Sequence, residues 1–193
     1  VNSVREGIYL EASKDGLGLK CSDLSLQIES VIPATVEEEG SIVVPGRIFS
    51  ELIRKLQGET TEISCESGTT LIKRAETTMQ GTPASEFSLM SVSDSDLRFS
   101  FKQRVLKDMI KQCIFATAQD ESKPILTGVL LEIDGQELIM VALDGYRLAL
   151  RREPLALNFD GRNAVIPAKS LSEIGRILLD TDDTVDLMVT KTH

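Results

Sequence analysis

The sequence predicts an α+β protein made of repeated strand–helix–strand units, and three observations support this fold class. Segments in which apolar and polar residues alternate indicate strands, because successive side chains of a strand point to opposite faces. Segments with apolar residues three and four positions apart indicate amphipathic helices. An internal repeat then divides the 193-residue chain into two similar units.

The repeat consists of blocks that recur at an offset of 121 or 122 residues. Its strongest block joins a strand, a proline and a helix, and five positions in that block are identical. A coincidence of similar strand–helix patterns is the alternative, although the common offset and order favour a duplication. The aligned blocks are 7–11 with 128–132, 23–26 with 144–148, and 44–56 with 166–178.

The first unit is expected to form seven short strands and one helix. Pro45 ends the fourth strand and begins a helix over residues 46–57, since the fixed φ of proline and its missing N–H are tolerated in a first helical turn. One apolar stripe runs along that helix through Ile48, Phe49, Leu52, Ile53 and Leu56. The strands are expected at 8–12, 17–21, 24–31, 41–44, 61–65, 71–75 and 77–81.

The second unit is expected to begin with a strand and a long amphipathic helix, and to repeat the helix that follows a proline. Asp144 and Gly145 predict a turn, because glycine permits backbone geometry that other residues resist. The strands are expected at 97–101, 128–132 and 138–143, and the helices at 102–118 and 169–179.

Residues 83–95 are rich in Ser, Asp and Glu and are expected to connect two domains, 1–93 and 94–193. At the repeat offset, the counterpart of 97–118 falls before residue 1, and the counterparts of 71–81 fall near and beyond residue 193. The sequence also does not begin with Met. We therefore expect the first domain to lack its opening strand and helix, and the second to lack its closing strands.

The composition argues against several classes of function. The chain has 21 Lys and Arg residues against 30 Asp and Glu residues, which gives a net charge of −9. This charge excludes a generally basic nucleic-acid binder. Aromatic residues at 4% and the absence of Trp argue against base stacking. The single His, at position 193, offers almost nothing to Ser–His or Cys–His catalysis or to a His-ligated metal. No catalytic, cofactor or metal site is expected, although an enzyme site assembled from distant residues stays open.

Cysteine use and hydropathy indicate a cytoplasmic protein. Cys21, Cys65 and Cys113 are odd in number and lie far apart without a CxxC pair, so buried free thiols are expected. No apolar run approaches 18 residues and no signal peptide is visible, so no membrane segment is expected.

Positive charge is concentrated in the expected helices. Their 40 residues hold nine basic and three acidic side chains, whereas the remainder holds 12 basic and 27 acidic ones. Arg47 and Arg54 lie seven residues apart and share one helix stripe, as do Lys169 and Arg176 at the repeat-equivalent positions. Two interpretations stay open: an ordinary solvated helix face, and a basic layer that contacts phosphates without reading base sequence.

Several stretches of the sequence carry a family resemblance. Residues 124–132 read Pro-Ile-Leu-Thr-Gly-Val-Leu-Leu-Glu, and residues 141–149 read Val-Ala-Leu-Asp-Gly-Tyr-Arg-Leu-Ala. Together with the strand–Pro–helix blocks 43–56 and 165–178 and the segment 82–87, they resemble the bacterial DNA polymerase III beta subunit family, the sliding clamps. The resemblance covers nearly the whole chain, and Asp-Gly-Tyr-Arg-Leu is its most specific part.

The resemblance implies a DNA-clamp fold with three similar domains per chain, of which the third is absent from this sequence. Antiparallel sheets would lie outside and helices would line the hole of a head-to-tail dimeric ring around duplex DNA. The implied function is a non-enzymatic processivity factor that slides without sequence specificity and holds DNA polymerase and clamp-loader subunits through linear motifs. The residues that would face DNA are Arg47, Arg54, Lys107, Lys111, Lys123, Lys169 and Arg176.

The resemblance also implies a peptide-binding pocket, of which this chain supplies the second-domain side. Leu143 and Tyr146 depart from the Thr and His of some members, which changes the expected pocket shape. The alternative is that Leu126, Leu143 and Leu148 are ordinary core residues. The pocket residues would be Leu126, Thr127, Gly128, Leu143, Gly145, Tyr146, Arg147 and Leu148. An alternative function is a free-standing protein-interaction module of the same fold without a DNA role, which would not account for the basic helices.

Overall fold

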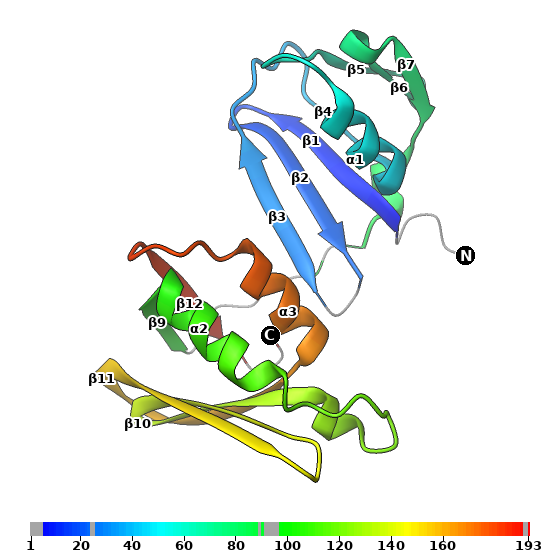
Figure 1. The fold of residues 1–193 in the computed structure, drawn as a ribbon. Helices are drawn as coiled ribbons and strands as arrows, with labels where there is room; N and C mark the ends of the chain where they lie inside the picture. Colours follow the sequence, from blue (N-terminus) through cyan, green and yellow to red (C-terminus); the bar gives the residue numbers. More distant parts are fainter. Residues whose placement is uncertain (1–5, 24–25, 89, 91–96, 191–192) are drawn as a thin grey trace. The chain divides into compact units, whose positions relative to one another are not determined.

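The computed structural model describes residues 6–23, 26–88, 90, 97–190 and 193. The chain divides into two compact units, residues 1–91 and 92–193 (Figure 1). The domain boundary expected between residues 93 and 94 lies outside the described residues. Both units combine antiparallel sheets with helices, so the predicted α+β fold class is confirmed.

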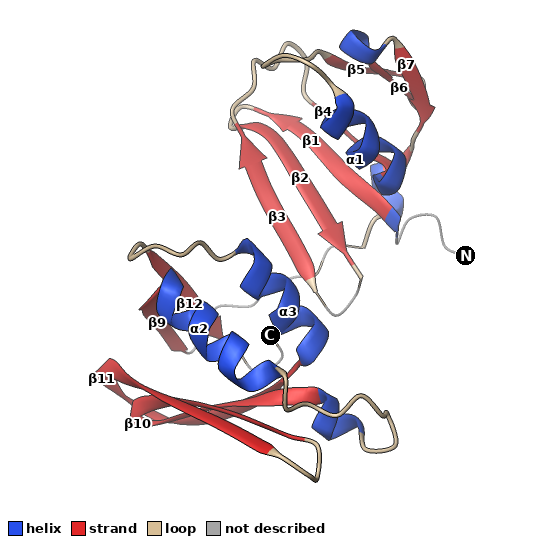
Figure 2. Cartoon of the chain, in the orientation of Figure 1, coloured by secondary structure: helices blue, strands red, loops and turns tan. Residues whose placement is uncertain are grey.

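Within the described residues of the first unit, the strands and helices are β1 (Gly7–Ser13), β2 (Gly16–Ser22), β3 (Gln27–Ile32), β4 (Gly40–Pro45), α1 (Gly46–Lys55), β5 (Ile63–Glu66), β6 (Thr69–Ile72), the 3-10 helix η2 (Lys73–Ala75), β7 (Thr77–Gln80), β8 (Thr82–Pro83) and the 3-10 helix η3 (Ala84–Glu86). A five-stranded sheet has the order β3-β2-β1-β4-β8, and a three-stranded sheet has the order β5-β6-β7. Figure 2 shows α1 beside these strands.

The core of the first unit joins α1 to both sheets. Leu10, Val44, Phe49 and Ile72 are buried in one cluster that draws on β1, β4, α1 and β6. Only one side of α1 meets the strands, so the buried stripe is narrower than the sequence predicted: Ile48 and Ile53, both expected in the stripe, are exposed.

The second unit, in residues 97–190, contains β9 (Leu97–Lys102), α2 (Gln103–Ile114), the 3-10 helix η4 (Pro124–Thr127), β10 (Gly128–Leu143), β11 (Leu148–Pro167), α3 (Ala168–Ile177) and β12 (Thr184–Val189). β10 pairs with β11 and β9 pairs with β12, both in antiparallel fashion. α2 packs on both β10 and β11, and α3 packs on α2 and β11. The two helices therefore cover one face of the long hairpin (Figure 1).

Alternation along β10 builds the core of this unit. Val129, Leu131 and Ile133 are buried, and so are Met140 and Ala142 beyond a shift of register near the middle of the strand. The apolar side of α2 joins the same cluster. The residues of β10 that alternate with these are mixed: Glu132 is half-buried and Asp134 is exposed, whereas Ile139 is also buried.

The internal repeat is visible in the geometry of α1 and α3. Each helix follows a proline, Pro45 or Pro167, each has ten residues, and each is followed by an extended leucine, Leu56 or Leu178. Both leucines donate their N–H to the carbonyl four residues earlier, at 3.1 and 3.0 Å. The N–H of each leucine thus completes the last helical turn, while its own extended backbone leads the chain out of the helix. Both helices therefore end two residues before their predicted ends.

Other predicted elements differ from the structure in their ends or were not predicted at all. The helix expected over 102–118 ends at Ile114, because the next residues form a tighter turn in which Ala116 and Thr117 donate their N–H to carbonyls three residues earlier. The strand expected at 71–75 ends in η2, and residues 24–25 of the third expected strand lie outside the described residues. Of β11, only the end before Pro167 was predicted, as the strand of the strand–Pro–helix block 165–178, and β12 was not predicted.

Part of the segment expected to connect the units is packed on the first unit instead. β8 pairs with β4, and the buried ring of Phe87 lies 5.5 Å from the ring of Tyr9. Residue 89 and residues 91–95 of the expected connector lie outside the described part of the chain.

The cysteines are free, but the expectation that all three are buried was wrong. Cys113 is buried and Cys21 is partly covered, whereas Cys65 is exposed on β5, an edge strand of the small sheet. Burial raises the pKa of the Cys21 and Cys113 thiols. Among the described residues, no helix is both long and apolar enough to cross a membrane.

Candidate functional site

The turn between β10 and β11 is held by the carboxylate of Asp144. Its Oδ1 accepts the backbone N–H groups of Tyr146 at 2.9 Å and of Arg147 at 3.0 Å, and its Oδ2 accepts Nε–H of Arg147 at 2.9 Å. Gly145 has a φ of +95°, which glycine adopts without strain. The turn predicted from Asp144 and Gly145 is therefore confirmed.

The same hydrogen bonds hold the pKa of Asp144 below its ordinary value, with the N–H of Tyr146 as the largest cause. A lowered folded-state pKa stabilises the fold above the unfolded carboxyl pKa of about 3.9, and this contribution is lost as the pH falls through the folded pKa. The turn is thus expected to keep its charged form throughout the neutral range.

Apolar side chains next to this turn face solvent. Leu143 and Leu148 are direct cross-strand partners and are 37% and 63% exposed, and the Tyr146 side chain is fully exposed at 100%. The neighbouring pair, Ala142 and Ala149, is buried, so alternation turns the leucines away from the core. A core role is therefore wrong for Leu148.

Leu126 and Thr127 lie in η4, close to the far end of α2. Leu126 is half-buried, and its carbonyl accepts the N–H of Ala118 at 2.8 Å. The Thr127 hydroxyl donates to the carbonyl of Pro124 at 2.7 Å and so closes the 3-10 turn. η4 is thereby fixed to the segment that leaves α2.

Phe115 was not predicted as a site residue, although the structure puts it beside the turn. Its ring is 55% exposed, and the Arg147 guanidinium carbon lies 5.6 Å from the ring centroid. Ala118 of the same segment holds Leu126, so residues 115–118 touch both groups of predicted pocket residues. The sequence did contain a signal for this site residue: Phe115 is an aromatic residue that lies one position beyond the apolar stripe of the expected helix.

Gly128 is buried at the start of β10 and leaves no room for a larger residue. A Cβ there would lie 2.5 Å from Cγ1 of Val165 and 3.0 Å from the carbonyl oxygen of Ile166. We expect Gly128→Ala to lower the free energy of unfolding by about 1–3 kcal/mol, as overpacked sites do. Urea denaturation measures this.

Gly40→Ala is the matched control for Gly128→Ala, since nothing lies within 4 Å of a Cβ at position 40. We expect the control to stay within about 0.5 kcal/mol of the unaltered protein. Equal unfolding midpoints for the two variants would contradict the steric role of Gly128.

The predicted DNA-facing residues of the first unit lie on the exposed side of α1. The Arg47 side chain is 90% exposed, and its Nε lies 3.2 Å from a carboxylate oxygen of Glu51, one turn further along. Arg54 is also exposed, in the last turn. α1 therefore presents both arginines to solvent, with one of the two charges shared with an acid.

In the second unit, the predicted DNA-facing residues come from both packed helices and one loop. Lys111 on α2 and Lys169 on α3 are exposed, Lys107 on α2 is half-buried, and Lys123 lies in the loop before η4. Arg176 on α3 is exposed and lies 2.8 Å from Glu173. The structure thus brings four cations onto α2 and α3 and leaves Lys123 off the helices.

Two other basic residues at the start of α2 form ion pairs with an aspartate. Asp182 accepts Lys102 at 3.0 Å and Arg104 at 2.7 Å, and these contacts, the Lys102 hydrogen bond first, hold the pKa of Asp182 low. Lys102 belongs to β9, so the three observed α-helices hold eight basic and three acidic residues. They remain positively charged in a chain of net charge −9.

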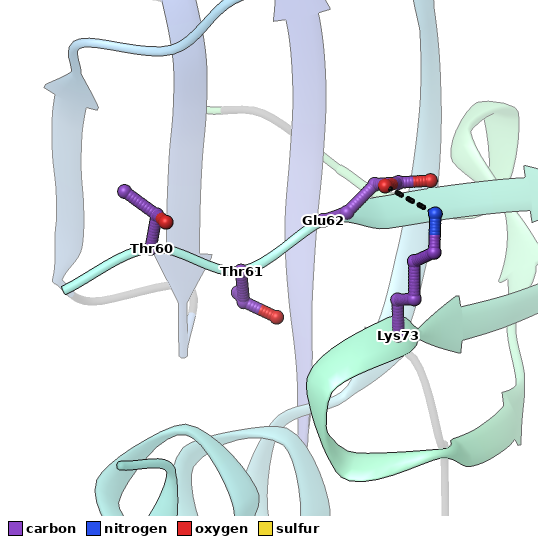
Figure 3. A pocket seen from close by; sticks show the side chains of 4 residues that line it. All are labelled: Thr60, Thr61, Glu62 and Lys73. Carbon is purple, nitrogen blue, oxygen red and sulfur yellow. Dashed lines mark hydrogen bonds and ion pairs between the residues drawn. The ribbon is translucent and has the colours of Figure 1, made fainter. Parts of the chain in front are cut away.

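A shallow depression of about 400 Å³ lies elsewhere in the first unit, at the chain segment that joins α1 to β5 and at the start of η2. Its lining residues are Thr60, Thr61, Glu62 and Lys73, and Figure 3 shows Lys73 turned toward Glu62, with which it forms a 2.8 Å ion pair. It contains none of the predicted site residues. In the described part of the chain, no group of three His, Cys, Asp or Glu side chains is arranged to hold a metal ion.

Comparison with protein families identifies two matches along the chain. The N-terminal domain of the DNA polymerase III beta subunit matches residues 1–96, and the central domain of the same subunit matches residues 100–193. Among curated proteins, the Beta sliding clamp of Bacillus subtilis is 37% identical over 199 residues, which cover 97% of this chain and 53% of that protein. The chain spans about half the length of the curated relatives it matches.

Solved structures show the same similarity in three dimensions. The DNA polymerase sliding clamp from Bacillus subtilis has a TM-score of 0.94 at 35% identity, covering 99% of this chain and 53% of that one. A putative DNA polymerase III beta subunit from Eubacterium rectale has a TM-score of 0.93 at 31% identity, covering 98% and 53%.

Proposed function

The chain belongs to the DNA polymerase III beta subunit family, the sliding clamps, and from this premise we propose that the complete protein is a processivity factor. It encircles duplex DNA without sequence specificity and tethers the replicative polymerase and the clamp loader. It acts in the cytoplasm, performs no chemistry of its own and self-associates into a dimeric ring.

The observation that carries the DNA part of this proposal is the charge of the helices. Eight basic and three acidic residues lie on α1, α2 and α3, while the chain as a whole carries −9. Long side chains on regular helices can reach phosphates. These helices offer no loop that could read the edges of the bases. Contact of this kind holds DNA loosely and depends steeply on salt. The proposed contacts are those of Arg47, Arg54, Lys107, Lys111, Lys123, Lys169 and Arg176.

We place the first two of three domains at residues 1–93 and 94–193, which agrees with the matches to an N-terminal and a central domain. A third domain completes each half of the ring. The peptide pocket is shared between the second and third domains, so its apolar floor is only partly present in this chain.

The exposed apolar residues beside the Asp144 turn support the peptide pocket. Leu143, Tyr146 and Leu148 are exposed, and Arg147 adds a charge at their edge. Such a site suits an extended peptide with one or two large apolar anchors. The proposed lining consists of Leu126, Thr127, Gly128, Leu143, Gly145, Tyr146, Arg147 and Leu148, with Gly128 and Gly145 contributing backbone shape.

Retention on circular DNA tests the proposed function. The complete protein is loaded by the clamp loader onto a nicked circular plasmid, and half of the sample is then cut once with a restriction enzyme. A topological tether is expected to stay with the circle through gel filtration and to leave the linear molecule by sliding off its ends. Affinity for either form is measured separately at the same salt.

Equal retention on circular and linear DNA would contradict a topological tether and indicate ordinary binding. Absence from both forms, with polymerase peptide still bound, would indicate the interaction module without a DNA role.

A further inference from the structure

Asp144 has two oxygens with separate partners in the structure. Oδ1 accepts the two backbone N–H groups that shape the turn, and Oδ2 accepts Nε–H of the Arg147 side chain. The turn closes on itself through the N–H of Asp144, which donates to the carbonyl of Arg147 at 3.3 Å. The carboxylate side chain is only 18% exposed, whereas the Arg147 side chain is 53% exposed.

In the first unit, Asp23 and Leu26 make two of the same hydrogen bonds. Asp23 donates its N–H to the carbonyl of Leu26 at 3.1 Å, and its Oδ1 accepts the N–H of Leu26 at 2.9 Å. The offset from Asp23 to Asp144 and from Leu26 to Arg147 is that of the internal repeat, 121 residues. The aspartate therefore makes the same two hydrogen bonds to the residue three positions later in either copy. In the second copy that residue is Arg147, whose guanidinium contacts the aspartate, and in the first copy it is Leu26.

Arg147 is held from two sides. Asp144 fixes Nε, and the exposed ring of Phe115 lies 5.6 Å beneath the guanidinium carbon. Among the described residues, its two terminal amino groups, Nη1 and Nη2, make no hydrogen bond, so both can donate to a ligand. A guanidinium fixed in one plane loses less freedom when it binds a carbonyl or carboxylate oxygen.

We propose that Asp144 is a positioning residue that, together with Phe115, fixes Arg147 as a two-pronged donor at the rim of the peptide pocket. The donor takes a backbone carbonyl or a carboxylate of the bound peptide, next to the apolar anchor that Leu143 and Leu148 receive. This inference rests on the proposed function, since it assigns a role within the proposed pocket.

Asp144→Asn separates the two roles of the side chain. The asparagine keeps an acceptor oxygen for the backbone N–H groups, and it replaces the oxygen that holds Arg147 by an amino group that cannot accept Nε–H. Asp23→Asn makes the identical change at the repeat-equivalent position of the first unit and serves as the matched control. Both variants are made in the complete protein and compared by thermal melting.

Fluorescence anisotropy measures the binding of a labelled peptide, the last ten residues of the replicative DNA polymerase of the same organism. We expect Asp144→Asn to weaken binding about tenfold, as loss of a charge-assisted contact does, and Asp23→Asn to leave it unchanged. In an Arg147→Ala background, Asp144→Asn is expected to cause no further loss. The two Asn variants should melt within a degree or two of each other.

Wild-type affinity in Asp144→Asn would overturn the positioning role, and so would a full tenfold further loss in the Arg147→Ala background. If Asp23→Asn weakened peptide binding equally, the loss would reflect general stability and would contradict a role of Asp144 in positioning Arg147. A wild-type protein that does not bind the peptide would overturn the proposed pocket itself, and with it the role of Asp144.

Discussion

Replacing Arg47, Arg54, Lys169 and Arg176 by glutamate in the complete protein is expected to reduce DNA affinity on the order of 100-fold at low salt. Each lost phosphate contact lowers the slope of log K against log salt by about 0.9, so four lost contacts lower it by about 3.6. The loss should be uniform across DNA sequences, because these side chains lie on regular helices and read no bases. Anisotropy titrations at several salt concentrations measure both quantities.

The fold should tolerate the four reversals. Two of the arginines pair with Glu51 and Glu173 on exposed helix faces, and such pairs are worth about 0.3–0.5 kcal/mol each. Reversal then places like charges three or four residues apart, which costs a similar amount. A melting temperature within a few degrees of the unaltered protein is therefore expected.

A control with the same change in net charge separates position from total charge. Four exposed cations outside the α-helices, two in each unit, are reversed together: Lys14, Lys73, Arg152 and Arg162. This set is expected to keep most of the DNA affinity and its salt slope. If the two quadruple variants lose affinity equally, the assignment of the helices to the DNA face is wrong.

Leu148→Ala is expected to weaken peptide binding by about 2 kcal/mol or more, the cost typical of an anchor position. The Leu148 side chain is 63% exposed at the end of the hairpin and lies opposite Leu143, so truncation removes apolar surface that a peptide can cover. Melting should barely change, since little buried surface is lost. Peptide anisotropy and differential scanning calorimetry of the complete protein provide the two measurements.

Met109→Ala is the matched comparison and should show the reverse pattern. Met109 has no exposed surface and sits in the core between α2 and the hairpin. Truncation of such a side chain costs about 2–5 kcal/mol of stability, while peptide affinity of the folded fraction should be kept. A Leu148→Ala protein that is destabilised as much as Met109→Ala and keeps its intrinsic affinity would refute the pocket.

The sequence was most informative where local signals and packing agree. Pro45 and Pro167 each precede a helix, and a leucine follows the last residue of each, so the ends of α1 and α3 were predicted to within two residues. Among the short strands of the first unit, β6 and β7 keep an alternation of buried and exposed residues, whereas β3 is exposed along nearly its whole length. The fold class could be predicted from these elements alone.

Long strands were harder to predict, because tertiary pairing rather than local pattern stabilises them. β11 contains Arg151, Arg152 and Glu153 followed by Pro154, a charged and proline-containing stretch that does not resemble a strand. Pairing with β10 stabilises it nonetheless. β12 alternates between exposed and half-buried residues, so its signal was present in the sequence, but it directly follows Asp180-Thr181-Asp182-Asp183, an acidic run typical of a turn.

The candidate site was predictable in its backbone and only partly in its side chains. Asp144 and Gly145 predict the turn, because the carboxylate accepts backbone N–H groups and glycine adopts a positive φ. Whether Leu148 faces the core or the solvent depends on the register of the hairpin, which a single sequence does not reveal. Phe115 follows the apolar stripe of a helix that ends one residue earlier than it, so its exposure depends on where that helix stops.

The three cysteines of this chain differ in solvent exposure, which favours labelling at one of them. Cys113 is buried, with its thiol donating to the carbonyl of Met140, and Cys21 is half-covered, whereas Cys65 is exposed. A maleimide dye used briefly at neutral pH should therefore modify Cys65 first, without any engineered residue. One fluorophore on the first unit would let single-molecule microscopy test whether the complete protein slides along stretched DNA, as proposed, and measure a diffusion coefficient if it does.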